Sequence, residues 1–165
     1  MTSKLLFYTH GLVDGGAERL WACLATAMKK RGYDVVFVQD FEAEDNRSNL
    51  DPSIPLYTLG KGHLSATRKL AEVLKKEKAD VAISAVGGSN TKLMIARWLA
   101  KVPLKTIITY HGFREWRTGL LSFLTYFGLP ILSAMADATV AVSDGLRERL
   151  VATWGAKPEK TVTIL

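Results

Sequence analysis

Seven short apolar runs recur along the chain, and most are separated by stretches with helical periodicity. They cover Lys4–Thr9, Asp34–Gln39, Leu56–Leu59, Asp80–Ser84, Lys105–Tyr110, Ala138–Val142 and Lys160–Leu165. Several of them lack the alternation of apolar and polar residues that marks a half-exposed strand, as in Val35-Val36-Phe37-Val38. Continuous apolar runs of this length are typical of parallel strands that are covered on both faces.

Apolar residues spaced three or four apart predict helices between these runs. Such spacing occurs at Ala17 to Met28, Leu64 to Leu74, Leu93 to Ala100 and Leu146 to Val151. We expect Ser89, Asn90 or Thr91 to cap the third of these helices and Ser143 to cap the last. Strands that alternate with helices predict an α/β fold: a Rossmann-like parallel sheet of about seven strands with helices on both faces.

The length of 165 residues suits one domain, residues 1–165, with a core of its own. The single cysteine, Cys23, excludes an internal disulfide, and its place between Leu20 and Leu24 predicts burial on a helix face. The apolar run from Leu5 to Tyr8 is too short for a secretory signal. We therefore expect a cytoplasmic protein.

The chain is basic, with a net charge of +6 and a pI of about 9.5. Many of the basic residues lie at the C-terminal ends of predicted helices, as Lys29-Lys30-Arg31 and Lys75-Lys76 do, where they offset the helix dipole. No dense basic run is left over for nucleic acid. We therefore expect no nucleic-acid partner.

A glycine-rich segment joins the first strand to the first helix, with Gly11 followed by Gly15 and Gly16. Glycines allow another molecule to approach the backbone, and the N-terminus of a helix favours anions. The spacing is neither Gly-x-Gly-x-x-Gly nor a phosphate-binding Walker loop. The segment therefore indicates a phosphate or small-ligand cradle, and a tight turn without a ligand is the alternative.

Open parallel sheets bind ligands beyond the carboxyl ends of their strands. That rule places the following candidates at one edge: His10, Asp14, Gly15, Gly16, Gly88, Ser89, Asn90, His111 and Arg114. Asp40 ends the second strand as the ribose-binding acid of a dinucleotide fold would, but an acid at the end of a strand is commonplace. We therefore do not include Asp40 in the site.

The segment Gly15-Gly16-Ala17-Glu18-Arg19 and the later Val140-Ala141-Val142-Ser143-Asp144-Gly145 resemble the N-terminal domain of retaining GT-B glycosyltransferases of family 4. The resemblance covers nearly the whole chain. It implies transfer of a hexose from a nucleotide sugar, which is a substrate, to a glycan or lipid-linked acceptor. It implies neither a cofactor nor a metal.

The resemblance also implies roles for single residues. His111 would act at the reacting centre, and Gly15 and Gly16 would face the donor phosphates. The acceptor side would hold His10, Asp14, Glu18, Arg19, Gly88, Ser89, Asn90 and Arg114. Each has a structural alternative: His111 could bond to nearby backbone, and Glu18 suits the positive end of a helix dipole in any case.

Such enzymes carry the nucleotide-sugar site in a second domain, with two glutamates spaced Glu-x7-Glu. No two glutamates of this chain have that spacing. We therefore expect that the C-terminal domain is absent here and that the chain alone is inactive. The alternatives are a stand-alone binding subunit of a split glycosyltransferase and a small NAD- or nucleotide-binding Rossmann protein.

Two segments fall outside the strand and helix pattern. The polar stretch Asp40–Pro55 predicts an exposed, mobile loop. The uncharged run Gly119–Ala136 touches the lower length limit of a membrane span, but its position between two strands favours a crossover helix. In a second interpretation, a membrane surface that holds a lipid-linked acceptor is contacted by Trp116, Arg117, Phe123, Tyr126 and Phe127.

Overall fold

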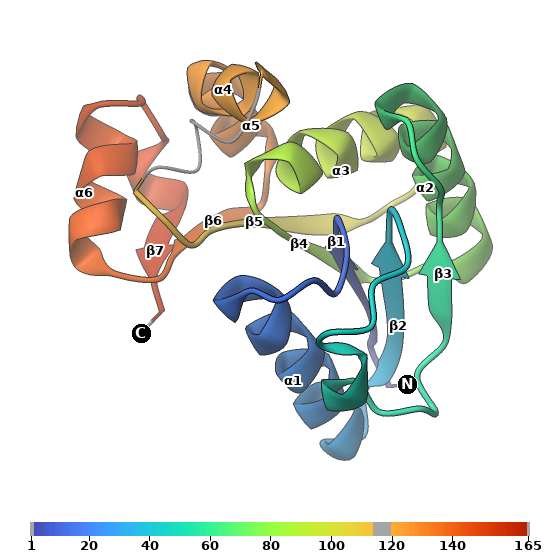
Figure 1. The fold of residues 1–165 in the computed structure, drawn as a ribbon. Helices are drawn as coiled ribbons and strands as arrows, with labels where there is room; N and C mark the ends of the chain where they lie inside the picture. Colours follow the sequence, from blue (N-terminus) through green and yellow to red (C-terminus); the bar gives the residue numbers. More distant parts are fainter. Residues whose placement is uncertain (1, 114–119, 165) are drawn as a thin grey trace.

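Seven parallel strands form one sheet, in the order β3-β2-β1-β4-β5-β6-β7 (Figure 1). The computed structural model describes residues 2–113 and 120–164. The strands are β1 (Lys4–Thr9), β2 (Asp34–Gln39), β3 (Leu56–Thr58), β4 (Val81–Ala85), β5 (Lys105–Tyr110), β6 (Ala138–Ala141) and β7 (Thr161–Thr163). Each begins within one residue of the predicted run, so the parallel α/β fold is confirmed.

Helices cover both faces of the sheet. They are α1 (Gly16–Lys30), α2 (His63–Glu77), α3 (Gly87–Ala100), α4 (Leu120–Phe127), α5 (Leu129–Met135) and α6 (Asp144–Ala152), with 3₁₀ turns η1 (Arg47–Asn49) and η3 (Pro158–Lys160). α1 lies on one face and α2 and α3 lie on the other (Figure 1). Alternate residues of β1 enter the two layers, because Phe7 packs with Trp21 of α1 whereas Leu6 and Tyr8 pack with α2 and α3.

The connections change direction at β1. The chain passes from β1 to β2 and β3 on one side, then crosses to β4 on the other side of β1. The loops that follow β1 and β4 therefore leave the sheet in opposite directions. Ligands of open α/β sheets bind in the crevice that such a switch point creates.

The helices differ in how they begin. The Ser143 hydroxyl accepts a hydrogen bond from the Leu146 N–H at 3.2 Å, so the predicted cap of α6 is confirmed. The N-cap residues of α1, α2 and α3 are Gly15, Gly62 and Val86, and none of them supplies a side-chain cap. The predicted cap of α3 is wrong, because that helix starts at Gly87 and already contains Ser89, Asn90 and Thr91.

The backbone of Val86 is strained. Its φ of 64° and ψ of 151° lie in a region that is nearly restricted to glycine, and its side chain is β-branched. Such a conformation costs about 1–3 kcal/mol and persists only where the surroundings impose it. Here the chain must leave β4 and enter α3 directly at the switch point.

Two expectations about burial need correction. The stretch 40–55 exposes charged residues such as Glu42 and Glu44, as expected, but it also packs on the fold, because Leu50 and Ile54 are buried and Asn46 donates to the Val13 carbonyl at 2.6 Å. Cys23 is exposed. The buried face of α1 is set by Trp21, Ala22 and Ala25, which turns Cys23 toward solvent.

The described part of the uncharged run, residues 120–136, forms two short helices, α4 and α5. Gly128 ends α4 with an N–H bond to the Leu124 carbonyl and precedes α5 directly. Within residues 2–113 and 120–164, no helix has the length and apolar character needed to cross a membrane. The run therefore supplies the crossover between β5 and β6.

Candidate functional site

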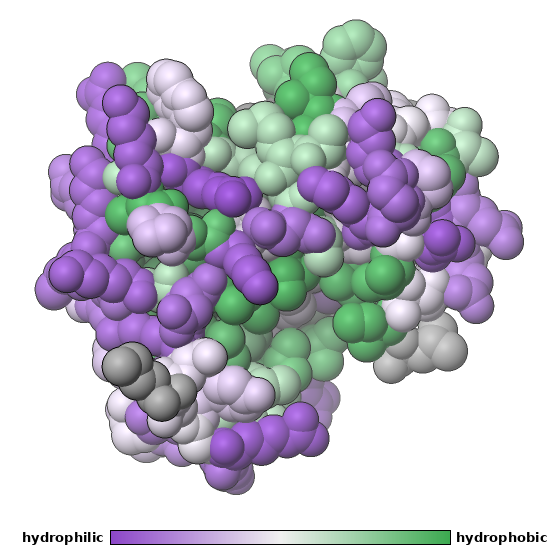
Figure 2. All heavy atoms as spheres, turned by 180° about the vertical axis from the view of Figure 1, so that it is seen from behind, coloured by the Kyte–Doolittle hydropathy of each residue, from purple (hydrophilic) through white to green (hydrophobic). Residues whose placement is uncertain are grey.

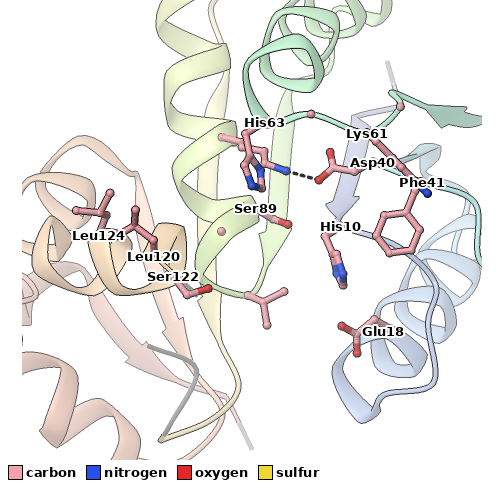
Figure 3. A pocket seen from close by; sticks show the side chains of 15 residues that line it. His10, Glu18, Asp40, Phe41, Lys61, His63, Ser89, Leu120, Ser122 and Leu124 are labelled. Carbon is pink, nitrogen blue, oxygen red and sulfur yellow. Dashed lines mark hydrogen bonds and ion pairs between the residues drawn. The ribbon is translucent and has the colours of Figure 1, made fainter. Parts of the chain in front are cut away.

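A cleft of about 1070 Å³ opens at the switch point between β1 and β4 (Figure 3). One wall carries His10, Asp40, Phe41 and Lys61, from the loops after β1, β2 and β3, and the opposite wall carries Leu120 and Leu124 of α4. Other residues that line it are Glu18, Gly60, Gly62, His63, Val86, Gly88, Ser89, Lys92 and Ser122. The cleft thus has one polar and one apolar wall.

Four of the predicted site residues meet in this cleft: His10, Glu18, Gly88 and Ser89. The ring of His10 meets the edge of the Phe41 ring, with centroids 4.9 Å apart. Gly11 leaves room for this contact, because a Cβ there would lie only 3.0 Å from the Phe41 ring. The loop after β1 is therefore held against the loop after β2.

Ser89 is the most notable of these four residues. Its side chain is 1 % exposed, and a hydrogen bond between its hydroxyl and Tyr8 offsets part of the rise in the pKa of that phenol. Figure 3 shows this oxygen directed into the cleft, between the polar wall and α4.

Asn90 has a different position from the one expected. It is fully buried and does not line the cleft. Its Oδ1 accepts from the Ser84 hydroxyl at 2.6 Å, and its Nδ2 donates to the Thr109 carbonyl at 2.9 Å. Asn90 therefore fastens α3 to β4 and β5.

A buried ion pair lies at the base of the cleft. Lys92 of α3 pairs with Asp40, and each side chain is 7 % exposed. The Tyr8 hydroxyl donates to the other oxygen of Asp40 at 2.7 Å. Burial, reinforced by the Asp40 carboxylate, raises the pKa of Tyr8 well above its ordinary value. The phenol is therefore a hydrogen-bond donor at every physiological pH.

The glycine segment lines a second, smaller hollow of about 420 Å³. Asp14, Gly15, Gly16 and Arg19 border it, together with Asp45, Asn46 and Asn49 of the next loop. The backbone N–H of Asp14 donates to Asp45 at 3.1 Å. The predicted donor-side and acceptor-side residues are thus divided between two neighbouring hollows at the start of α1.

Gly15 and Gly16 differ in what surrounds them. A Cβ on Gly15 would overlap Glu18 Oε2 and lie 3.1 Å from its Cδ, whereas a Cβ on Gly16 would meet nothing within 4 Å. Neither glycine has a positive φ. A side chain at position 15 would therefore displace the Glu18 carboxylate, whereas no contact within the described chain disfavours one at position 16.

His111 follows β5 and is half-buried against α1. Its Nε2 lies 2.9 Å from the Thr109 hydroxyl, and its ring meets the edge of Trp21 at a centroid distance of 5.4 Å. Burial lowers the pKa of His111. The imidazole is therefore neutral near pH 7 and can both donate and accept a hydrogen bond. Arg114, Trp116 and Arg117 lie outside the described residues.

Sequence reasoning overlooked three basic residues of the cleft: Lys61, His63 and Lys92. Lys61 stands between two glycines with positive φ, Gly60 at 95° and Gly62 at 109°. A lysine flanked by glycines at the end of a strand is a signal that the carboxyl-edge rule could have used. Lys92 could not be found in this way, because its partner Asp40 is 52 residues away in the sequence.

Among the residues that the structure describes, no three histidine, cysteine, aspartate or glutamate side chains gather as a metal site would need. The expectations that neither a metal nor a cofactor takes part stay predictions. The polar groups of the cleft are hydroxyl, imidazole, ammonium and the carboxylates of Glu18 and Asp40, which suit a polar ligand.

Comparison with known proteins agrees with the fold and the resemblance. The family model described as Glycosyltransferase Family 4 matches residues 14–165. A Haemophilus influenzae protein named "Uncharacterized glycosyltransferase" is 33 % identical over 103 residues, which are 59 % of this chain and 29 % of that protein.

Solved structures of low sequence identity share the fold. Anabaena HepE, in complex with UDP and glucose, has a TM-score of 0.77 and 17 % identity, over 98 % of this chain and 44 % of HepE. The lipopolysaccharide outer core galactosyltransferase WaaB has a TM-score of 0.65 and 13 % identity, over 96 % of this chain and 44 % of WaaB. MurG of Acinetobacter baumannii has a TM-score of 0.61 and 17 % identity, over 98 % of this chain and 44 % of MurG. The chain spans less than half the length of each of these relatives.

Proposed function

The chain belongs to glycosyltransferase family 4, and from this premise we propose that it forms the acceptor-side lobe of a hexosyltransferase. In this proposal a second lobe holds a nucleotide sugar, and the hexose passes with retention to a glycan or lipid-linked acceptor. The proposal of a nucleotide-sugar donor is supported by HepE, which has the fold of this chain and binds UDP and glucose. MurG shares the same fold. Without the second lobe the chain transfers no sugar.

The observation that carries the proposal is the cleft at the β1/β4 switch point. It collects side chains from the ends of several strands and from three helix starts, as a substrate site in an open α/β sheet does. Its polar wall offers groups that bind sugar hydroxyls, including His10 and Ser89. This is the surface on which we place the acceptor.

Gly16 supports the placement of the donor. It is exposed, it is the first residue of α1, and alanine would fit there without any clash. Alanine is also the better helix former. A glycine is therefore useful at this position if a ligand approaches the backbone closely, as a diphosphate at a helix N-terminus would.

His111 is the candidate catalytic residue of the proposed enzyme. Because burial lowers its pKa, it meets the substrate as a neutral imidazole. A neutral imidazole held by Thr109 can orient a sugar hydroxyl without adding a charge beside the leaving diphosphate. Charge on that diphosphate would be stabilised by groups of the second lobe.

The test uses the complete protein, with this chain joined to its second lobe, and follows release of UDP from UDP-glucose in the presence of acceptor. We expect His111→Ala to lower kcat by about 100-fold or more, the range of one positioned acid–base group. Cys23→Ala, an exposed change on α1, is the matched control. Unchanged turnover in His111→Ala, with an intact fold by circular dichroism, would remove His111 from the mechanism.

The alternatives from the sequence have their own outcomes. An NAD-binding protein would use the acid after β2 for the ribose, but the Asp40 carboxylate is already engaged by Lys92 and Tyr8. Tight binding of NAD by the chain would nevertheless contradict our proposal. Sugar transfer that appears only after a separate polypeptide is added would identify a split enzyme instead.

Peripheral contact with a membrane is part of the same proposal. Figure 2 shows hydrophobic surface gathered over α4 and α5. Leu120 and Phe127 are each 75 % exposed, and Ile131 is 67 % exposed. We expect the chain to float with vesicles that contain anionic lipid, because a basic protein gains affinity from both charge and apolar contact. Failure to float with either neutral or anionic vesicles removes this part of the proposal.

A further inference from the structure

We infer that Thr109 is a positioning residue that keeps the imidazole proton of His111 on Nε2, so that the ring meets a substrate hydroxyl as a hydrogen-bond acceptor at Nδ1. The inference rests on the proposed function for the role of His111, and it adds which nitrogen faces the substrate. In a neutral histidine the hydrogen bonds around the ring decide which nitrogen carries the proton.

The Thr109 hydroxyl has only one proton to donate. Its Oγ1 lies 2.9 Å from the backbone carbonyl oxygen of Ser84 and 2.9 Å from Nε2 of His111. A carbonyl oxygen can only accept a hydrogen bond, whereas a nitrogen of a neutral imidazole donates or accepts according to the tautomer. The Thr109 hydroxyl therefore donates to Ser84 and accepts from His111, which places the imidazole proton on Nε2.

Burial makes this direction hard to reverse. Thr109 is 4 % exposed and Ser84 is fully buried. If Thr109 donated to His111 instead, its oxygen and the Ser84 carbonyl oxygen would face each other with no proton between them. Bulk water does not reach this carbonyl to replace the lost donor, so the cost of reversal falls on one tautomer alone. The tautomer with the proton on Nε2 therefore predominates.

The Thr109 side chain is itself held from two other elements. Asn90 of α3 donates from Nδ2 to the Thr109 carbonyl at 2.9 Å, and its Oδ1 accepts from the Ser84 hydroxyl at 2.6 Å. Ser84 of β4 is thus bonded to Thr109 through its carbonyl and to Asn90 through its hydroxyl. Asn90 lies outside the cleft, yet through Thr109 it helps to position His111.

Trp21 restrains the orientation of the same ring. The Trp21 and His111 rings meet edge to face, with an angle of 84° between their planes. Trp21 is 3 % exposed, and the Phe7 ring of β1 meets it with centroids 5.9 Å apart. An imidazole turned by half a revolution would present a carbon to Thr109 and lose the hydrogen bond. The His111 ring therefore has one orientation as well as one tautomer.

This arrangement has a consequence for the substrate. With its proton on Nε2, the ring can accept a hydrogen bond only at Nδ1. A sugar that meets the ring there must present a hydroxyl, because an ether oxygen or a carbon has no proton to donate to it. Sites that are built around one hydroxyl discriminate strongly against analogues that lack it. Thr109 would in this way contribute to substrate specificity without touching the sugar.

The test reads the tautomer directly, by ¹H–¹⁵N NMR of the imidazole nitrogens in the chain as it stands, at a pH where the rings are neutral. The chain has three histidines, and the signals of His111 are identified by their absence in His111→Gln. We expect Nε2 to show the shift of a protonated nitrogen and Nδ1 that of an unprotonated one. We also expect the Nε2 proton to exchange slowly with solvent. A proton on Nδ1 would overturn the inference without any variant of Thr109.

Variants of Thr109 test its part in this result. Thr109→Val keeps the branched shape but removes the acceptor, so the Nε2 proton should exchange rapidly and both nitrogen shifts should move toward the average of two tautomers. Thr109→Ser keeps the hydroxyl and should restore the original spectrum. Thr139→Val is the matched control, because it removes a buried hydroxyl of β6 that has no partner among the described residues. Identical His111 spectra for the original chain and Thr109→Val would refute the role of Thr109.

Turnover of the complete protein separates this inference from the proposed function. There Thr109→Val should lower kcat by about tenfold, because the imidazole remains but is no longer held in place. Thr109→Ser should recover most of that loss. If His111→Ala leaves turnover unchanged, the proposed role of His111 fails whatever its tautomer. If the enzyme needs His111 but carries the proton on Nδ1, the proposed function stands and this inference fails.

Discussion

Lys92→Met should be among the most destabilising single changes in this chain. The substitution preserves the length of the side chain but removes the ammonium group, and Asp40 is then left as a buried carboxylate with one donor, the Tyr8 hydroxyl. Breaking a buried ion pair in this way costs about 3–5 kcal/mol. For a chain of this length, that corresponds to a fall of roughly 6–20 °C in Tm.

The assay is urea unfolding followed by far-ultraviolet circular dichroism. Lys105→Met, at an exposed position where β5 begins, is the control and should change the free energy of unfolding by less than about 0.5 kcal/mol. Adding Asp40→Asn to Lys92→Met should restore at least about 2 kcal/mol, because no unpaired charge then remains. A loss below about 1 kcal/mol for Lys92→Met, or no recovery in the double variant, would refute the reasoning.

Two further predictions concern other parts of the chain. Gly16→Ala should stabilise the fold by about 0.5–1 kcal/mol. Gly15→Ala must displace the Glu18 side chain and should not stabilise the fold. Equal shifts of the urea unfolding midpoint in the two variants would contradict the geometry at the start of α1. Burial alone would raise the pKa of Glu77, but hydrogen bonds from Lys4 and the Tyr57 hydroxyl lower it. The ionised Glu77 side chain therefore stabilises the fold above pH 4.5, the ordinary pKa of a glutamate. This contribution is lost as the pH falls through the lower pKa that Glu77 has in the folded state. Glu77→Gln should therefore cost about 1 kcal/mol at pH 7 and less at pH 3, and a cost that does not change with pH would disprove this assignment.

The strands were the most predictable part of the structure. Val35 to Val38 are buried on both faces of the sheet, and such runs are visible in the sequence without any knowledge of the neighbours. The stretch 40–55 was misjudged in part, because its polar composition hides the few residues that pack on the fold. Its packing depends on a few residues, among them Asn46, whose amide meets the Val13 carbonyl across 33 positions of sequence.

The site was predictable only in part, for a related reason. The carboxyl-edge rule brought His10, Gly88 and Ser89 to one cleft, because strand ends fix those positions. It could not tell that Asn90, one residue after Ser89, is committed to Ser84 and Thr109. Which face of a helix turns inward is decided by tertiary packing, and the same uncertainty explains the exposure of Cys23.

The two outer strands of the sheet have a consequence for behaviour in solution. β3 and β7 are the edge strands of the sheet, and each is only three residues long. Each therefore offers few unpaired backbone N–H and C=O groups to another polypeptide. A long, flat edge strand, by contrast, acts as a template for self-association and aggregation. With its borders this short, the domain should remain monodisperse at concentrations where a sheet with full-length borders would begin to polymerise.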